Sequence, residues 1–362
     1  MADLNVNSIG DASGGTTATV NGFTPTASNM AGRNRIINGD MRIDQRNAGA
    51  SVTPSDNAYT LDRWRSGASQ SSKYSIQQNA GSVTSPEGFS NYLGVTSLSS
   101  YSILASDYFF IRQRIEGFNV ADLGWGTANA KTITLSFWVR SSLTGTFGGS
   151  VQNSASDRSY PFSYTISSAN TWEQKSITIV GDTSGTWGTT NGNGLSLTFG
   201  FGVGTDRTGT AGSWAGTNYA SATGATSVVG TSGATFYITG VQLEEGSVAT
   251  PFEHRQYGQE LALCQRYAYV PSGTPSYSLA WSAGSLAFIG HAIPHPQLMR
   301  ATPTISGVTS FVIQGVTASA VGFAYSATAS YLLLGGSNSN GQSDGVLRTV
   351  NSNQIPIISA EL

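Results

Sequence analysis

Two tryptophans stand in loops whose other residues are mostly Gly, Thr, Ser, Ala and Asn. Trp187 lies in the run TSGTWGTTNGNG and Trp214 in the run TAGSWAGTNYAS. An aromatic ring can stack on the C–H face of a sugar while amides and hydroxyls bind its hydroxyl groups, so these loops predict a carbohydrate-binding platform. The alternative is that each tryptophan packs its loop onto the body of the fold. The polar partners expected beside the two indoles are Asn191, Asn193, Asn218 and Tyr219.

Two histidines have a spacing that occurs in metal sites. His291 and His295 are four residues apart, which brings two imidazoles to one face only on a helix. Pro294 and Pro296 exclude a helix there, because proline lacks the N–H that an interior helical position needs. The sequence therefore predicts that these histidines lie at a strand edge or an interface and bind no metal.

Catalysis has little support in the sequence. Enzymes that cleave glycans use paired carboxylates, whereas the acids of this chain are few and mostly lie in expected loops, as Asp157, Asp182 and Asp206 do. No nucleophile elbow, phosphate-binding loop or cysteine–histidine pair is visible. Cys264 belongs to an apolar helical face and is expected to be buried and unreactive. The sequence predicts a protein that is not an enzyme.

Short alternating runs divided by Gly, Ser, Asn and Asp turns predict the strands that position these residues. In the clearest run, Ile133, Leu135, Phe137 and Val139 fall on one face. Long helical periodicity and heptad repeats are absent. The fold class predicted is all-β, with a jelly-roll β-sandwich. Its expected strands are 73–77, 109–115, 132–140, 148–153, 160–166, 173–179, 195–201 and 235–243.

The chain is expected to have four parts. Residues 1–32 hold too little apolar surface to fold alone and predict an extended arm that docks on a partner, with a loose terminus as the alternative. Residues 33–255 form the sandwich, and residues 256–269 form a connector with a short helix at 258–267. Residues 270–362 form a smaller β domain. Its expected strands are 277–281, 286–291, 304–308, 311–314, 322–325 and 331–335.

Composition excludes several kinds of protein. Only 10% of the 362 residues are charged, 44 are glycine, and the net charge is −2. This balance gives no attraction to nucleic acid or to anionic membranes. No apolar run is long enough to cross a membrane, so no membrane insertion is expected.

The first residues, MADLNVNSIGDASGG, show neither a basic segment nor an apolar one, so no signal peptide is predicted. A single cysteine cannot form a disulfide within the chain. Both observations predict synthesis in a reducing cytoplasm.

Two blocks of sequence carry a family resemblance. The first begins at Asn34 as NRIINGDM and continues through DQR to YTLDRW. The second, GVQLEEG, is followed by TPFE and by LCQRY, which ends at Tyr267. In this order the blocks resemble the jelly-roll region of bacteriophage tail-fibre and related virion proteins. The resemblance extends over residues 33–267 and weakens beyond them.

The resemblance implies a structural calcium ion between the first and last strands of the jelly roll, where both blocks fall. Calcium prefers six to eight oxygen ligands, which carboxylates and carbonyls supply. As an alternative, one of the two adjacent glutamates faces solvent and the other pairs with an arginine such as Arg42 or Arg63. The candidate calcium ligands are Asp40, Asp44, Glu244 and Glu245.

The resemblance also implies a function and partners. It identifies the chain as a structural virion protein, expected to be a homotrimeric tail fibre that binds host-surface glycans during attachment. Residues 1–32 would contact other virion proteins, and the C-terminal β domain would supply trimer contacts. Low charge suits a chain that is buried against copies of itself, although a neutral soluble β protein would share it. The alternatives are a head fibre or capsid decoration protein, a glycan-degrading spike, and a spacer without a ligand.

Overall fold

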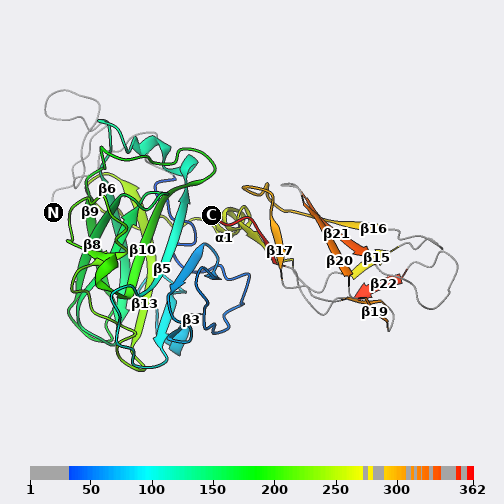
Figure 1. Ribbon diagram of the computed structural model, residues 1–362, viewed down its shortest axis with the longest axis horizontal. Helices are drawn as coiled ribbons and strands as arrows, with labels where there is room; N and C mark the ends of the chain where they lie inside the picture. Colours follow the sequence, from blue (N-terminus) through cyan, green and yellow to red (C-terminus); the bar gives the residue numbers. More distant parts are fainter. Residues whose placement is uncertain are drawn as a thin grey trace, which may run out of the picture. The chain divides into compact units, whose positions relative to one another are not determined.

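The computed structural model describes residues 32–271, 295–306 and 357–362. Between 272 and 294 and between 307 and 356 it describes only the backbone of several strands. The chain divides into two compact units between Arg255 and Gln256. The first is a β-sandwich, and the described part of the second contains one short helix and small sheets (Figure 1). The fold is all-β, as predicted. The expected arm lies outside the described residues except for Gly32.

Two antiparallel sheets form a sandwich of the jelly-roll type (Figure 1, blue to yellow-green). One sheet has the strand order β1-β2-β5-β10-β7-β8 and the other β3-β4-β13-β6-β9. Their bounds are β1 Tyr59–Leu61, β2 Trp64–Ala68, β3 Tyr74–Gln78, β4 Leu93–Ser97, β5 Tyr108–Glu116, β6 Ile133–Ser141, β7 Gly145–Gln152, β8 Ser159–Ile166, β9 Glu173–Ile179, β10 Asn193–Val203 and β13 Thr235–Glu245.

The core lies between the two sheets, where alternating side chains of both meet. Ile133, Leu135, Phe137 and Val139 of β6 are all fully buried, which confirms the predicted inner face. Across the layers, the rings of Phe137 and Phe199 pack edge to face with their centres 5.0 Å apart. Burying one such large side chain stabilises the fold by about 1.5–3 kcal/mol, so this core dominates the stability of the sandwich.

Each strand expected in the sandwich is present, with small shifts at its ends. The predictions missed β1, β2 and β4, and the last two each contain a glycine. A Cβ at Gly67 would lie 2.3 Å from the ring of Phe110, and one at Gly94 would lie 2.5 Å from the Cβ of Ala80. These glycines therefore belong to strands whose backbone is closely packed against a neighbour.

The second unit begins with the helix α1, which spans Tyr257–Gln265 and buries Cys264 completely, as expected. Each strand expected in this unit overlaps an observed one. Its sheets have the orders β14-β23-β17, β15-β22-β18-β19 and β16-β21-β20. The bounds are β14 Ala268–Tyr269, β15 Ser276–Leu279, β16 Ile289–Pro294, β17 Thr304–Ser306, β18 Phe311–Ile313, β19 Val316–Ala318, β20 Ala320–Tyr325, β21 Ala329–Gly335, β22 Arg348–Asn351 and β23 Ile357–Ser359.

Candidate functional site

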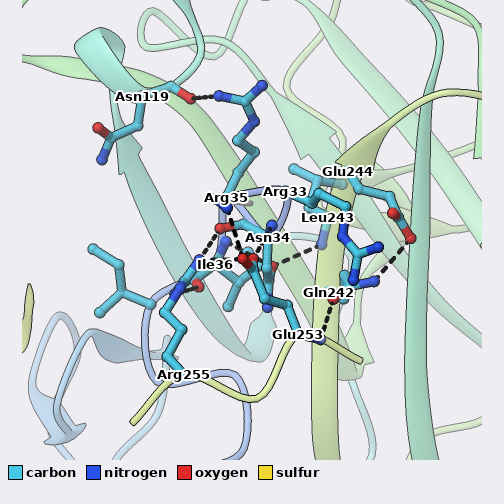
Figure 2. Close-up of polar contacts among 12 residues, drawn as sticks. Arg33, Asn34, Arg35, Ile36, Asn119, Gln242, Leu243, Glu244, Glu253 and Arg255 are labelled. Carbon is cyan, nitrogen blue, oxygen red and sulfur yellow. Dashed lines mark hydrogen bonds and ion pairs between the residues drawn. The ribbon is translucent and has the colours of Figure 1, made fainter. Parts of the chain in front are cut away.

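The start of the first sequence block lies beside the strand that opens the second (Figure 2). Strand β13 pairs with β4 only as far as Ile238, and beyond it the segment 34–39 occupies the place of β4. The buried side chain of Asn34 joins the two: its Oδ1 accepts a hydrogen bond from Leu243 N at 3.1 Å, and its Nδ2 donates to Val241 O at 3.0 Å. Residues 32–39 and 241–255 form one unit, which we call the clasp.

Two glycines of these blocks are required by the geometry of the clasp. A Cβ at Gly39 would lie 2.2 Å from Val241 O, so any side chain there would push the two segments apart. Gly240 has a φ of +60°, and the strand bulges between Thr239 and Gln242. Glycine adopts this conformation most readily, which gives a structural reason for Gly240.

Glu253 and Arg255 complete the clasp where the chain leaves the sandwich (Figure 2). The carboxylate of Glu253 accepts hydrogen bonds from Gly32 N at 2.7 Å and Asn34 N at 2.8 Å. The guanidinium of Arg255 donates to the main-chain oxygens of Asn34 and Ile36. These contacts hold the two segments together, so the clasp has a structural role.

Two of the acids proposed for calcium are engaged close to the clasp. Asp40 forms an ion pair with Arg42. Asp44 closes a turn by accepting hydrogen bonds from the N–H groups of Asn47 at 3.1 Å and Gly49 at 2.8 Å. Burial raises the pKa of Asp44, and the two main-chain hydrogen bonds oppose that shift.

The other two acids lie at the end of β13 and have separate partners. Glu244 is buried and accepts hydrogen bonds from the N–H and hydroxyl of Thr250 at 2.8 and 2.6 Å. Glu245 forms an ion pair with Lys131 at 3.0 Å. Within the described residues, no three acidic, histidine or cysteine side chains lie close enough to share a metal ion. This arrangement does not fit a calcium ion held by the four acids, because calcium needs six to eight oxygen ligands.

Trp187 and Trp214 belong to a cluster that includes the buried Trp125. The ring centres of Trp125 and Trp187 are 4.7 Å apart and those of Trp187 and Trp214 are 5.5 Å apart, with the planes nearly perpendicular. The indole N–H groups of Trp187 and Trp214 donate to the main-chain oxygens of Ser184 and Val180. Both rings are half-buried against the core, so they pack their loops onto the sandwich.

The four polar residues expected beside these indoles do not gather around them. Asn191 is exposed, and Asn193 begins β10 and donates to Ser196 Oγ at 3.0 Å. Asn218 accepts a hydrogen bond from Gln152, while the half-buried Tyr219 packs its ring over the backbone of the same loop. Asn218 lines a pocket that neither tryptophan lines.

This pocket, of about 120 Å³, lies on the outer face of the six-stranded sheet. Along β5, Phe109 and Ile111 face the core, so the residues between and beside them face outward. Phe110 and Tyr108 stack with ring centres 5.5 Å apart and an interplanar angle of 25°. The lining residues are Asp56, Asn57, Arg65, Tyr108, Phe110, Arg112, Arg207, Asn218 and Ala220.

Guanidinium groups extend this aromatic stack at both ends. The guanidinium of Arg112 lies over the ring of Phe110, 4.6 Å from its centre, and that of Arg207 lies over Tyr108 at 5.0 Å. Such cation–π contacts are attractive and fix the planes of both partners. The wall of the pocket is therefore a row of flat groups, two aromatic rings between two guanidiniums.

A chain of hydrogen bonds connects Arg112 to residues 208–222, a segment that crosses the outer face of the sheet. Arg112 Nε donates to Thr198 Oγ1 at 2.8 Å, and its Nη2 donates to Gln152 Oε1 at 2.5 Å. Gln152 Nε2 in turn donates to Asn218 Oδ1 at 2.8 Å. The crossing segment carries the short parallel pair β11 (Thr208–Gly209) and β12 (Ser221–Ala222). It covers Arg112, which is 8% exposed.

The pocket carries an excess of positive charge. Three arginines and one carboxylate, Asp56, line it, which leaves two positive charges. Burial lowers the pKa of Arg112 to about 9, and the nearby guanidiniums of Arg65, Arg114 and Arg207 add to that shift. Arg112 is still charged at neutral pH. Asp56 accepts a hydrogen bond from the hydroxyl of Tyr108 at 3.1 Å.

Tyr108, Phe110 and Arg112 are absent from the sites that sequence reasoning proposed. The signal that could have found them is the run YFFIRQR at 108–114, in which every second residue is aromatic or cationic. In a strand with one face in the core, such residues share the outer face.

Comparisons with known proteins reveal only distant similarities. No protein-family profile and no curated protein sequence matches the chain. Solved structures that are similar include the enzymatically active domain of tailspike protein 4 of bacteriophage CBA120, at 11% identity and a TM-score of 0.34, covering 59% of this chain and 21% of that one. A putative sugar-binding protein of Bacteroides thetaiotaomicron is similar at 11% identity and a TM-score of 0.34, covering 59% of this chain and 100% of that one. A family 11 carbohydrate-binding module of Clostridium thermocellum, solved with a tetrasaccharide, is similar at 13% identity and a TM-score of 0.26, covering 56% of this chain and 98% of that one.

No helix among the described residues is long and apolar enough to span a membrane.

Proposed function

We propose that this chain binds glycans through the pocket on the outer face of its six-stranded sheet. The observation that carries the proposal is the stacked pair Tyr108 and Phe110, which forms a wall beside the amide of Asn218. Sugars are bound by apolar surfaces together with a few placed hydrogen-bonding groups. The edges of the stacked rings would supply the first and the amide of Asn218 the second. The aromatic wall is built on strand β5, so little order must be gained there on binding.

The glycan would lie across the mouth of the pocket rather than inside it. Pockets that enclose a drug-sized ligand have volumes of roughly 300–1,000 Å³. At about 120 Å³, this pocket holds one substituent or one edge of a sugar ring. The remaining sugars would contact the surrounding sheet and the segment that carries β11 and β12. Affinity per site would accordingly be modest.

The protein is proposed to be a non-enzymatic virion component of a bacteriophage, a homotrimeric tail fibre that attaches to host-surface glycans. The two sequence blocks that resemble such proteins support this proposal, and Asn34 of the first is hydrogen-bonded to Val241 and Leu243 of the second. Residues 1–32 would dock on other virion proteins, and three copies would convert weak sites into strong attachment by raising the effective concentration. Removing residues 1–32 and measuring incorporation into tails or heads distinguishes a tail fibre from a head fibre.

A binding role fits the pocket better than glycan cleavage does. Glycoside hydrolysis uses two carboxylates on either side of the bond that breaks. Among the described residues that line the pocket, Asp56 is the only acid, and it is held by the hydroxyl of Tyr108. Release of reducing ends from a bound polysaccharide would contradict a purely binding role.

A glycan array with the full-length protein tests the proposal. We expect Tyr108→Ala to lose binding to the glycans that the unchanged protein retains. Phe118→Ala is the matched control, because Phe118 is 61% exposed and is not part of the pocket. Trp187→Ala tests the loop platform separately. The proposal is refuted if no glycan binds, or if Tyr108→Ala binds as the unchanged protein does.

A further inference from the structure

Several arginines elsewhere in the sandwich form ion pairs with acids, but those that line the pocket do not. Arg35 pairs with Asp122 at 2.6 Å, and Arg158 pairs with Asp182 at 2.7 Å. Within residues 32–271, no ion pair is formed by the three guanidiniums that line the pocket. They belong to Arg65, Arg112 and Arg207.

Two of the three guanidiniums are held in place by neighbouring groups. Arg112 is fixed by its hydrogen bonds to Thr198 and Gln152 and by the ring of Phe110. Arg207 is fixed over Tyr108. Positively charged groups held in advance around a concavity bind an anion without a further loss of side-chain freedom.

Holding these positive charges close together lowers the stability of the folded state. Arg112 is buried beside other guanidiniums, and a buried charge without a counter-charge destabilises the folded state. Arg65 adds a buried Nε that has no hydrogen-bond partner from the protein. Asp56 offsets only one of the three charges and is itself exposed. An anion bound in the pocket would supply both the missing charge and the missing hydrogen-bond acceptor.

We infer that the pocket takes the anionic group of an acidic sugar, a carboxylate or a phosphate, through Arg65, Arg112 and Arg207. The inference rests on the proposed glycan binding and names its ligand class. Planar guanidiniums match the geometry of both anions, because they can donate two parallel hydrogen bonds. The small volume fits one such group, with the sugar ring lying against Tyr108 at the mouth.

An array that pairs every acidic glycan with its neutral counterpart tests the inference. Each uronic acid is printed beside its methyl ester, and each phosphorylated sugar beside its dephosphorylated form. We expect binding to acidic members and not to their counterparts, with the better class identifying carboxylate or phosphate. Equal binding to both members, or binding to neutral members alone, overturns the inference and leaves the proposed function standing. Binding to no glycan overturns both.

Substitutions then locate the anion. For the acidic glycan that binds best, Arg65→Gln and Arg207→Gln are each expected to weaken affinity about ten-fold, measured by calorimetry. Arg112→Gln is expected to weaken it further if that variant folds, and the first two variants decide the question if it does not. Arg140→Gln is the matched control, because Arg140 lies on β6 and donates to Asn170 O. Unchanged affinity in both Arg65→Gln and Arg207→Gln refutes the inference.

Discussion

Replacing Asn34 with alanine is expected to destabilise the sandwich strongly, although no large side chain is lost. Asn34 is 4% exposed, and its amide satisfies three main-chain groups: the N–H of Ile36, the N–H of Leu243 and the C=O of Val241. A buried polar group left without a partner costs about 1–3 kcal/mol. The free energy of unfolding should therefore fall by at least about 3 kcal/mol, since three groups lose their partner.

For a domain of this size, about 3 kcal/mol corresponds to a melting temperature lower by roughly 6–12 °C. Thermal unfolding followed by near-ultraviolet circular dichroism measures the change. Asn119→Ala is the matched control, because only the main-chain oxygen of Asn119 takes part in the contacts of Figure 2, accepting from Arg35. A loss below about 1 kcal/mol in Asn34→Ala would show that the clasp does not depend on this amide.

Three further predictions concern stability. Asp182→Ala leaves Arg158 without its two hydrogen bonds at 2.7 and 2.8 Å, so the free energy of unfolding should fall by about 2 kcal/mol in urea titrations; no change would show that the pair contributes nothing. Burial alone would raise the pKa of Asp107, but hydrogen bonds from a main-chain N–H and from hydroxyls outweigh it and leave that pKa lowered, while the hydrogen bond from Lys175 lowers the pKa of Glu173. Both carboxylates therefore stabilise the fold above about pH 4, and their contribution is lost as pH falls through their lowered pKa values. The free energy of unfolding of the unchanged protein should then approach that of the double variant Asp107→Asn, Glu173→Gln as the solution is acidified. A constant difference between about pH 7 and pH 3 would contradict this linkage. The four acids named as candidate calcium ligands have separate protein partners. Treatment with EDTA followed by addition of calcium should therefore leave the melting temperature unchanged. A rise on adding calcium would reveal a site that these contacts do not account for.

Sequence patterns predicted the strands well where one face is apolar. The run that became β6 has four core residues at every second position, so its inner face could be assigned directly. Strands β2 and β4 could not be predicted in this way, because Gly67 and Gly94 are required by the rings that pack on them from other strands. Close approach between distant segments has no local signal.

The candidate site was harder to predict than the fold. Tryptophans in glycine-rich loops predict a platform, but in the structure Trp125, Trp187 and Trp214 contact one another in one packed cluster. Arg112 lies on the outer face of a strand and yet is buried, because the segment around β11 and β12 covers it. Which loop covers which face depends on tertiary structure. The alternation along β5 was the one local clue.

The measurement that tests the central claim most directly is hydroxyl-radical footprinting of the full-length protein with and without a bound glycan. Tyr108 in the pocket and Trp187 and Trp214 in the loops are all half-buried, so one experiment reports on both surfaces. Glycan binding in the pocket predicts that oxidation of Tyr108 falls while that of the two tryptophans is unchanged. Protection of Trp187 and Trp214 with Tyr108 unaffected would contradict the account and place the glycan on the loops.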